Sequence, residues 1–506
     1  MGRTARQRVL LVGGALAALA TNPVAFATDV QLQGAAGAPM STAIAAERAA
    51  SGGSPDAVQT AYNRARDFQE AVRAAGTGSP SCQGLARALT ALASTLVDEQ
   101  EAFDRPDSAA RSAAASAMSS RSAAVTRSAG TCRPSSTGLG TPVVVSMQPA
   151  SGEVFYSNVV ASVPTGAMQV KVVVNGRPWK NLPVFGATVR IPTSGRPQRY
   201  NWLLTFTDGS GATVGTASAE HTWYLPPSAK QAVSGRRESA AASARLASAV
   251  RGFNGTAGVW VQDLTTGQYA GANAGAKFPA ASLVKLGLLA GAAARLGQNP
   301  QKSPYFYDLQ QIAGWSSNLA ANRVVGGLGS GCGTSSDALA NDGLRRLGAK
   351  SSTFTGCYIA GTELQPGLPD APATSSPALD TSRYTTAQDL GRMMFALQAS
   401  AVGKPGARSD TGLSAKQGRL ILGLLLSSQQ RFENRSLFAG GLPGNTPLAQ
   451  KNGWLRSARG SAGVGFTSSG PVIMAVLMQA SSGVSRSSAQ TLGAQVARVA
   501  TSLGSN

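Results

Sequence analysis

The chain has 506 residues, of which 43% are hydrophobic and 14% charged, and its formal net charge is +21 at pH 7. This length suits about three domains of ordinary size, each able to bury a core. The single histidine, His221, excludes a metal site built from several histidines, and scattered arginines with only 6% aromatic residues give no stacking platform, so neither a metal nor a nucleic acid partner is expected.

The first residues are typical of an export signal. Three arginines stand at the start: Arg3, Arg6 and Arg8. The apolar run Val9–Ala20 is too short to span a bilayer comfortably, and Ala25-Phe26-Ala27 matches a small-x-small cleavage site. We therefore expect residues 1–27 to be a signal peptide, with an uncleaved anchor as the alternative. No cysteine follows the apolar run, so a secreted, extracytoplasmic protein without a membrane anchor is expected after cleavage.

Export also guides the interpretation of the charge and of the cysteines. A basic exported protein suits an anionic polymer of the cell envelope as its partner, and a basic surface without such a partner fits equally well. The cysteines are four: Cys82, Cys132, Cys332 and Cys357. An even number in an exported chain suggests two disulfides. Of the three possible pairings, Cys82–Cys132 and Cys332–Cys357 keep each bond inside one predicted domain.

Residues 28–135 are predicted to form a helical domain. Residues 28–50 are rich in Ala and Gly and are expected to be weakly ordered. From Pro55 to Ala129 apolar residues recur at helical spacing, which indicates an all-α bundle of about three helices. We find no candidate catalytic residues here, so a spacer or docking module is expected.

In residues 142–227 the residue pattern instead repeats at every second position, as in β-strands. Val170–Val174 reads as a strand and is followed by Asn175-Gly176, a strong signal for a hairpin turn. Further short strands at regular spacing predict an all-β sandwich of the immunoglobulin-like kind. Such modules mostly space or bind.

Residues 239–506 contain both helical and strand patterns. Gly258–Leu264 is predicted to be a strand with a return strand at Gln268–Ala272, and a buried helix starts near Ser282. A hairpin around residues 462–479 and a final helix follow after several helical stretches. The sheet of this α/β (α+β) domain is therefore expected to take strands from both ends of the domain, with a helical region between them.

The chemistry is predicted to lie in this last domain. Ser282 and Lys285 stand three residues apart, on one face of the predicted helix. A serine hydroxyl becomes a good nucleophile when a base takes its proton, and a lysine can do so when burial or another cation lowers its pKa. Alone, such a Ser-x-x-Lys is expected about once by chance in a chain of this composition.

Two further segments complete the pattern. Ser316-Ser317-Asn318 offers a hydroxyl and an amide, although in isolation a helix N-cap serine is the better explanation. Lys451-Asn452-Gly453-Trp454 offers a second lysine before the terminal hairpin, although a solvated lysine at a strand edge would also fit.

In this order the three segments resemble the Ser-x-x-Lys, Ser-x-Asn and Lys-Thr-Gly motifs of the serine β-lactamase and penicillin-binding (D,D-peptidase) superfamily. Three longer stretches are similar to class A β-lactamases: Phe278–Leu286, Thr385–Leu390 and Leu442–Trp454. The resemblance covers about residues 241–505. It implies a β-lactamase/transpeptidase-like domain that needs no cofactor and acts on a β-lactam or a peptidoglycan-derived peptide.

The resemblance also implies a role for each matching residue. Ser282 would be the acylated nucleophile, Lys285 its general base, and Ser316 the donor of a proton to the leaving nitrogen. Asn318 would hold the substrate amide. A substrate carboxylate would meet the third segment: Lys451, Asn452, Gly453 and Trp454. The backbone N–H groups of Ser282 and Trp454 would form the oxyanion hole.

Three departures from the family pattern stand out. Asn452 replaces the usual Thr or Ser, and the 34 residues from Ser282 to Ser316 are fewer than in class A enzymes. No Glu-x-x-x-Asn signature for a deacylating base is found, and Glu363 is the only acid close to the right place. Two hypotheses result: an acyl-serine hydrolase, or a non-catalytic envelope-binding protein that keeps the fold.

Overall fold

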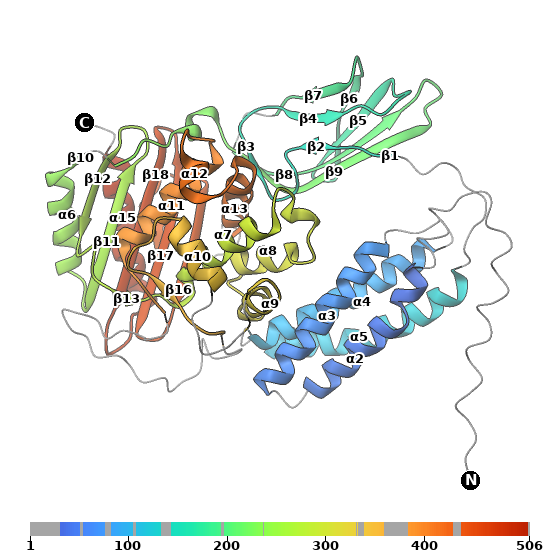
Figure 1. Ribbon diagram of the computed structural model, residues 1–506, viewed down its shortest axis with the longest axis horizontal. Coiled ribbons are helices and arrows are strands. Elements are labelled where there is room, and N and C mark those ends of the chain that lie inside the picture. The colour runs from blue at the N-terminus through green and yellow to red at the C-terminus, as the bar shows by residue number, and fades with distance from the viewer. Residues whose placement is uncertain are drawn as a thin grey trace, which may run out of the picture. The chain divides into compact units, whose positions relative to one another are not determined.

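The computed structural model consists of two compact units, Met1–Pro142 and Val143–Asn506 (Figure 1). The described residues are 31–50, 54–75, 82–104, 108–132, 143–193, 197–235, 237–329, 331, 338–358, 383–428 and 437–503. The expected signal peptide therefore lies outside them. No helix among them is long and apolar enough to cross a bilayer.

The first unit is a helical bundle. Its helices are α2 (Ala38–Ala50), α3 (Pro55–Ala75), α4 (Gln83–Asp104) and α5 (Ser108–Thr131). Apolar side chains at helical spacing are buried, among them Phe68, Leu89 and Leu96. The expected disulfide Cys82–Cys132 is present and joins the start of α4 to the end of α5. The expectation of weak order before residue 50 was wrong for α2, because alanine, which dominates this segment, is the best helix former.

Two acidic side chains meet inside this bundle. Burial, followed by the neighbouring carboxyl of Glu47, raises the pKa of Glu99 to about 7. Glu99 is a carboxylic acid with a raised pKa, so the folded bundle binds its proton more tightly than the unfolded chain does. The bundle is therefore stabilised below the unfolded pKa of 4.5, and this stabilisation is lost as the pH rises through 7.

We expect Glu99→Gln to raise the thermal midpoint of the helical unit at pH 8 and to leave it nearly unchanged at pH 4. The amide stays neutral where the carboxyl must ionise against burial and Glu47. Calorimetry at the two pH values measures the difference, and Asp98→Gln, at an exposed neighbour, is the control. An equal gain at both values would show that ionisation of Glu99 does not limit stability.

The β region of the second unit has two sheets around one core. The larger has the order β1-β9-β8-β5-β6, with β3 also paired to β9, and the smaller has the order β2-β4-β7. Its strands are β1 (Val143–Val144), β2 (Met147–Gln148), β3 (Val154–Phe155), β4 (Val159–Ser162), β5 (Gln169–Val174), β6 (Arg177–Pro183), β7 (Thr188–Ile191), β8 (Gln198–Thr207) and β9 (Thr213–Tyr224). Val172 and Trp202 of the larger sheet share their cluster with Val159 and Ile191 of the smaller. The expected turn between β5 and β6 has positive φ at Asn175 and Gly176, as a tight hairpin requires.

The C-terminal domain is built on a sheet of the order β10-β12-β11-β18-β17-β16. Its strands are β10 (Arg237–Glu238), β11 (Thr256–Asp263), β12 (Gln268–Ala272), β16 (Leu448–Trp454), β17 (Ala458–Thr467) and β18 (Gly470–Gln479). The antiparallel pairing of β11 with β18 joins the two ends of the domain, as predicted from the sequence. This α/β architecture is the predicted one.

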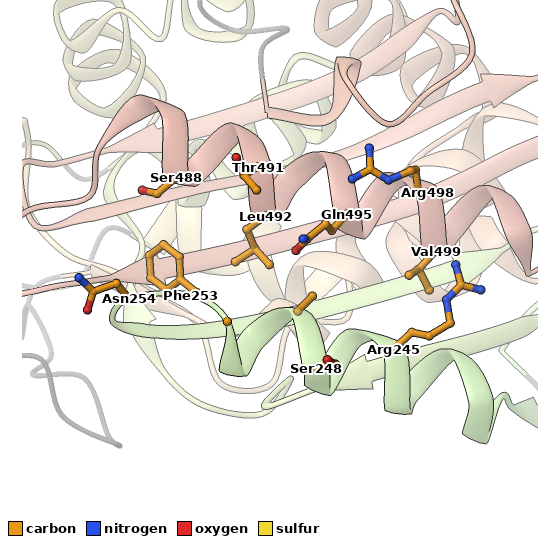
Figure 2. A pocket seen from close by; sticks show the side chains of 12 residues that line it. Arg245, Ser248, Phe253, Asn254, Ser488, Thr491, Leu492, Gln495, Arg498 and Val499 are labelled. Atoms are coloured by element: carbon orange, nitrogen blue, oxygen red, sulfur yellow. The ribbon is translucent and has the colours of Figure 1, made fainter.

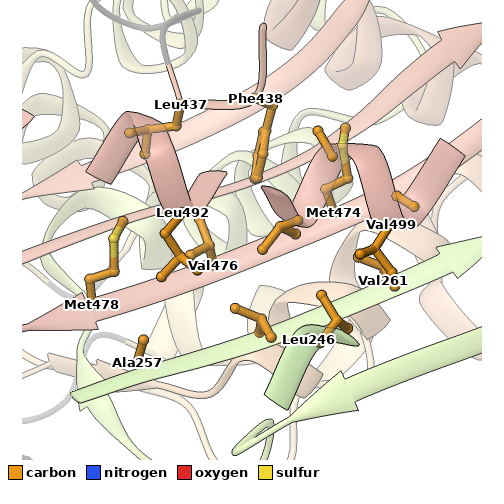
Figure 3. Close-up of a cluster of buried hydrophobic side chains, with 14 of the residues drawn as sticks. Leu246, Ala257, Val261, Leu437, Phe438, Met474, Val476, Met478, Leu492 and Val499 are labelled. Carbon is orange, nitrogen blue, oxygen red and sulfur yellow. The ribbon is translucent and has the colours of Figure 1, made fainter. Parts of the chain in front are cut away.

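Helices cover both faces of this sheet (Figure 1). On one face, α6 (Ala240–Arg251) and α15 (Arg486–Ser502) pack with every second residue of β18, including Met474 and Val476 (Figure 3). The alternate residues of β18 are buried too and face the remaining elements. These are the turn η2 (Ala281–Val284), the helices α7 (Lys285–Leu296), α8 (Phe306–Gly314), α9 (Asn318–Leu328), α10 (Ala338–Arg346), α11 (Ala387–Ala401), α12 (Ala407–Thr411) and α13 (Ala415–Ser427), and the small sheet β13 (Phe278–Pro279), β15 (Arg383–Thr385), β14 (Thr353–Phe354). Two further turns are η1 (Pro227–Lys230) and η3 (Pro300–Lys302).

The β region packs directly on helix α13. The backbone of Gly152 lies so close to α13 that a methyl group on Gly423 would come within 1.9 Å of the Gly152 carbonyl oxygen. Next to this contact, Gln301 donates a hydrogen bond to the buried Glu153 (2.9 Å). Helix α13 also contacts strand β16, where Ser428, the residue that caps the helix, donates from Oγ to the Gln450 carbonyl (3.2 Å). The β region therefore packs on a helix that in turn supports β16.

Candidate active site

Ser282 lies in the turn η2 at the entry to helix α7, and it is 3% exposed. A backbone bond from Leu283 N to the Ala280 carbonyl (2.9 Å) closes the turn. Ala281 has φ = +45°, a conformation that costs energy for a residue with a side chain and is concentrated at functional turns. The chain thus presents Ser282 at a sharp bend, with its backbone N–H at the positive end of a helix.

Lys285, the first residue of α7, is fully buried. Its Nζ donates to the carbonyl oxygen of Ser316 (2.5 Å) and to Oδ1 of Asn318 (2.7 Å). The ring of Tyr358 lies on a further side, with its centroid 4.1 Å from Nζ. A buried lysine is thus held beside the predicted nucleophile, on the same helical turn.

Ser316 lies in the tight turn between α8 and α9 and has φ = +64°. The ion pair of Asp308 and Arg323 (3.4 Å) holds these two helices together. The N-cap of α9 is Ser317, whose Oγ accepts from Ala320 N (3.1 Å). The N-cap role that the sequence allowed for this segment therefore belongs to Ser317, and the hydroxyl of Ser316 is available for a different contact.

That contact is with Lys451 on strand β16. Its Nζ donates to Ser316 Oγ (2.7 Å) and to the Asn452 carbonyl (2.8 Å), and the residue is 2% exposed. The two predicted lysines are thus not on opposite sides of the domain. Lys285 contacts the carbonyl of Ser316 and Lys451 contacts its hydroxyl.

The other residues of the third segment have distinct surroundings. A methyl group on Gly453 would lie 2.6 Å from the Ala280 carbonyl and 3.1 Å from Leu283 N, so this glycine lets β16 pack directly against η2. Asn452, on the alternate face of the strand, accepts at Oδ1 from Ser461 Oγ (2.6 Å) on β17. The ring of Trp454 packs on the guanidinium of Arg459 (4.7 Å).

Sequence reasoning missed two residues near the site. Tyr358 contacts Lys285, and Ser461 fixes Asn452. Ser461 lies opposite Asn452 in the β16–β17 hairpin, a pairing that the sequence analysis did not predict. Nothing in the spacing of the sequence points to Tyr358.

The sequence profile described as the "Beta-lactamase enzyme family" matches residues 241–503 of the chain. The chain belongs to this family. The membership predicted from the motifs is thereby confirmed, and the matched range contains all three motif segments. No curated protein matches the chain.

Solved structures also match part of this chain. An acyl-enzyme complex of a PBP-A variant with penicillin G is 16% identical, with a TM-score of 0.41, and the match covers 53% of this chain and 99% of that one. A β-lactamase from Desulfarculus baarsii is 19% identical, with a TM-score of 0.40 and coverages of 51% and 96%. The reconstructed class A β-lactamase of the last common ancestor of Gram-negative bacteria is 21% identical, with a TM-score of 0.38 and coverages of 52% and 99%.

Within residues 241–503, the structure describes these acidic residues: Asp263, Asp308, Asp342, Asp389 and Asp410. Asp389 accepts from Lys350 N (3.0 Å), Ser351 N (2.6 Å) and Arg392 (2.9 Å) and so has a structural role. Glu363, the acid nearest the place of a deacylating base, and Cys332 of the second expected disulfide lie outside the described residues. Within the described residues, no group of three or more His, Cys, Asp or Glu side chains is arranged to hold a metal ion.

Two other features lie away from the Ser282 site. A cavity of about 590 Å³ lies between α6 and α15, on the opposite face of the sheet, and is lined by Arg245, Phe253 and Arg498 among others (Figure 2). His221 belongs to β9 of the β region, where Arg199 contacts its Nδ1 (3.1 Å). Burial, and then the charge of Arg199, lower the pKa of His221.

Proposed function

We propose that the protein is a secreted serine hydrolase that forms an acyl-enzyme on Ser282 with β-lactams or with peptidoglycan-like amide bonds. The observation that carries the proposal is the convergence of two buried lysines on Ser316, beside a serine at a helix entry. Burying two ammonium groups is costly unless strong acceptors surround them. Such an arrangement is expected where proton transfer requires it.

The geometry supports the following sequence of steps. Lys285, in its neutral form, takes the proton of Ser282 as Oγ attacks the carbonyl carbon. The backbone N–H groups of Ser282 and Trp454 stabilise the oxyanion. The C–N bond then breaks while the Ser316 hydroxyl gives its proton to the leaving nitrogen. The Ser316 hydroxyl, which accepts from Lys451, is then reprotonated within the group formed by Lys285, Ser316 and Lys451, so that in total one proton moves from Ser282 to the leaving nitrogen.

Substrate binding is assigned to groups near these steps. Asn318, whose Oδ1 already accepts from Lys285, would hold the substrate amide through its NH2 group. Lys451 would attract the substrate carboxylate. Asn452 would have a supporting role, because the bond from Ser461 to its oxygen holds β16 to β17 beside Lys451.

The parts outside residues 241–503 are proposed to have no catalytic role. The signal-like start supports export to the cell envelope. The two packed sheets, in which β1 and β3 pair with β9 in parallel and the remaining pairs are antiparallel, are compatible with an immunoglobulin-like spacer or binding module. The charge of +21 suits an anionic envelope polymer as a partner.

Incubation with benzylpenicillin followed by intact-mass measurement tests the proposal. We expect one adduct per chain, located on Ser282, which Ser282→Ala abolishes and Ser409→Ala, at an exposed serine of α12, leaves intact. A stable adduct would identify a penicillin-binding enzyme, and rapid turnover would identify a β-lactamase. Neither adduct nor turnover would favour the alternative, a non-catalytic envelope-binding protein.

A further inference from the structure

Tyr358 contacts Lys285 and the residue that precedes Ser282. Its ring centroid is 4.1 Å from Lys285 Nζ, and its hydroxyl donates to the carbonyl of Ala281 (3.3 Å), the residue before Ser282. The side chain is 8% exposed. An aromatic ring attracts a cation on its face, and the attraction is strongest when both are removed from water.

Helix α9 fixes Tyr358 in this position. Asn322 donates from Nδ2 to the Tyr358 carbonyl (2.6 Å) and accepts at Oδ1 from Tyr358 N (2.8 Å). Asn322 stands one helical turn after Asn318, which accepts directly from Lys285. One helix therefore supplies an acceptor for the lysine and also places the ring against it.

A second cation lies on the same ring. The guanidinium of Arg383 on β15 is 4.0 Å from the Tyr358 centroid and donates to the Cys357 carbonyl (2.8 Å). Among the residues that the structure describes, these contacts link Lys285 to two charged groups: Arg383, on the shared ring, and Lys451, through Ser316. The positive charges of both groups disfavour the protonated form of Lys285. The ring and the two acceptor oxygens favour it.

We propose, on the basis of the function proposed above, that Tyr358 is a positioning residue for Lys285. Its ring directs the ammonium of Lys285 toward Ser316 and Asn318 and offsets the repulsion from Lys451 and Arg383. It thereby sets the pH at which Lys285 loses its proton and Ser282 becomes acylated.

The test replaces the ring without changing its shape. Phenylalanine and a series of progressively fluorinated phenylalanines at position 358 of the full chain weaken the attraction for a cation in steps. We expect the pH midpoint of the acylation rate with benzylpenicillin to move downward along the series, because a weaker attraction lets Lys285 lose its proton at lower pH. The total shift is expected to be about 0.5–1.5 pH units.

Two substitutions by natural amino acids complete the experiment. Tyr358→Phe keeps the ring and should retain the wild-type midpoint within about 0.3 pH units, because only the hydroxyl bond to Ala281 is lost. Tyr358→Leu should shift the midpoint downward and also lower the maximal rate by about tenfold or more, because Lys285 loses its orientation. Phe395→Leu, which removes a lysine–aromatic contact with Lys404 (4.8 Å) outside the site, is the matched control.

The two proposals fail in different ways. If wild-type protein acquires no adduct at any pH, the proposed function is wrong. If it is acylated but the midpoint stays constant across the fluorinated series, Tyr358 does not act through Lys285 and the inference is overturned. The fluorinated series keeps the volume of the ring, so the test remains decisive if Tyr358→Leu does not fold.

Discussion

Lys285→Met is expected to fold and to lose acylation of Ser282 by at least about a thousandfold. The reason is that Ser282 then has no amine to accept its proton, and a positioned general base contributes about 10²–10⁴ in rate. Methionine is apolar and similar in length, so it fills the space of a side chain that is fully buried. The second-order rate of adduct formation with benzylpenicillin, followed by intact mass, measures the loss.

The fold should survive because opposing effects act on stability. The Ser316 carbonyl and Asn318 Oδ1 each lose a donor, which costs about 1–3 kcal/mol per unsatisfied group. Removing a buried ammonium recovers its desolvation penalty, which is several kcal/mol. Circular dichroism and the thermal midpoint check the fold. Lys404→Met, at a half-buried lysine that donates to Ser234, is the control. Acylation of Lys285→Met at the wild-type rate would contradict the assigned role.

Sequence patterns predicted most of the C-terminal domain because its strands and turns are local. The predicted return strand at residues 268–272 is β12, and the predicted terminal hairpin is β17 and β18, which extend beyond the expected ends. Pairing β11 with β18 required a longer argument, since more than two hundred residues separate them along the chain. It followed from finding strand patterns at both ends of one domain.

The site was predictable to different degrees. Ser282 and Lys285 are one helical turn apart, so the helix alone places them together. Ser316 and Lys451 are 135 positions apart, and only the order of the motifs indicated that they meet. The structure adds what no motif contains: Ser317 takes the N-cap, which leaves the hydroxyl of Ser316 to Lys451.

Tyr358 shows why the remainder could not be predicted. It meets Lys285 because two hydrogen bonds with the side-chain amide of Asn322 hold its backbone and Arg383 packs on its ring. Each of these contacts joins segments that are distant in sequence and share no periodic pattern. A tyrosine between Cys357 and a further apolar residue is also an ordinary core position, so its chemistry appears only with its neighbours.

Gly453→Ala is expected to lower the stability of the domain by about 1–3 kcal/mol, the range for overpacking a core. We also expect it to slow acylation of Ser282 by about a hundredfold. The added methyl group would lie 2.6 Å from the Ala280 carbonyl oxygen and 3.1 Å from Leu283 N. Both are backbone atoms of the turn that carries Ser282, so no side chain can rotate away to make room. Strand β16 must shift outward.

An outward shift of β16 affects the chemistry because the strand carries Lys451, and a displacement of about 1 Å at a reacting group can cost 10² in rate. Gly444→Ala is the matched control, because that glycine, in the loop before β16, has no atom within 4 Å of an added methyl group. Chemical denaturation gives the stability of each variant, and adduct formation with benzylpenicillin gives the rate. Loss of stability with an unchanged rate would mean that the distance between β16 and η2 does not limit acylation. Loss of both, for Gly453→Ala alone, would show that the close approach of strand and turn brings Lys451 to Ser316 and so completes the proton path beside Ser282.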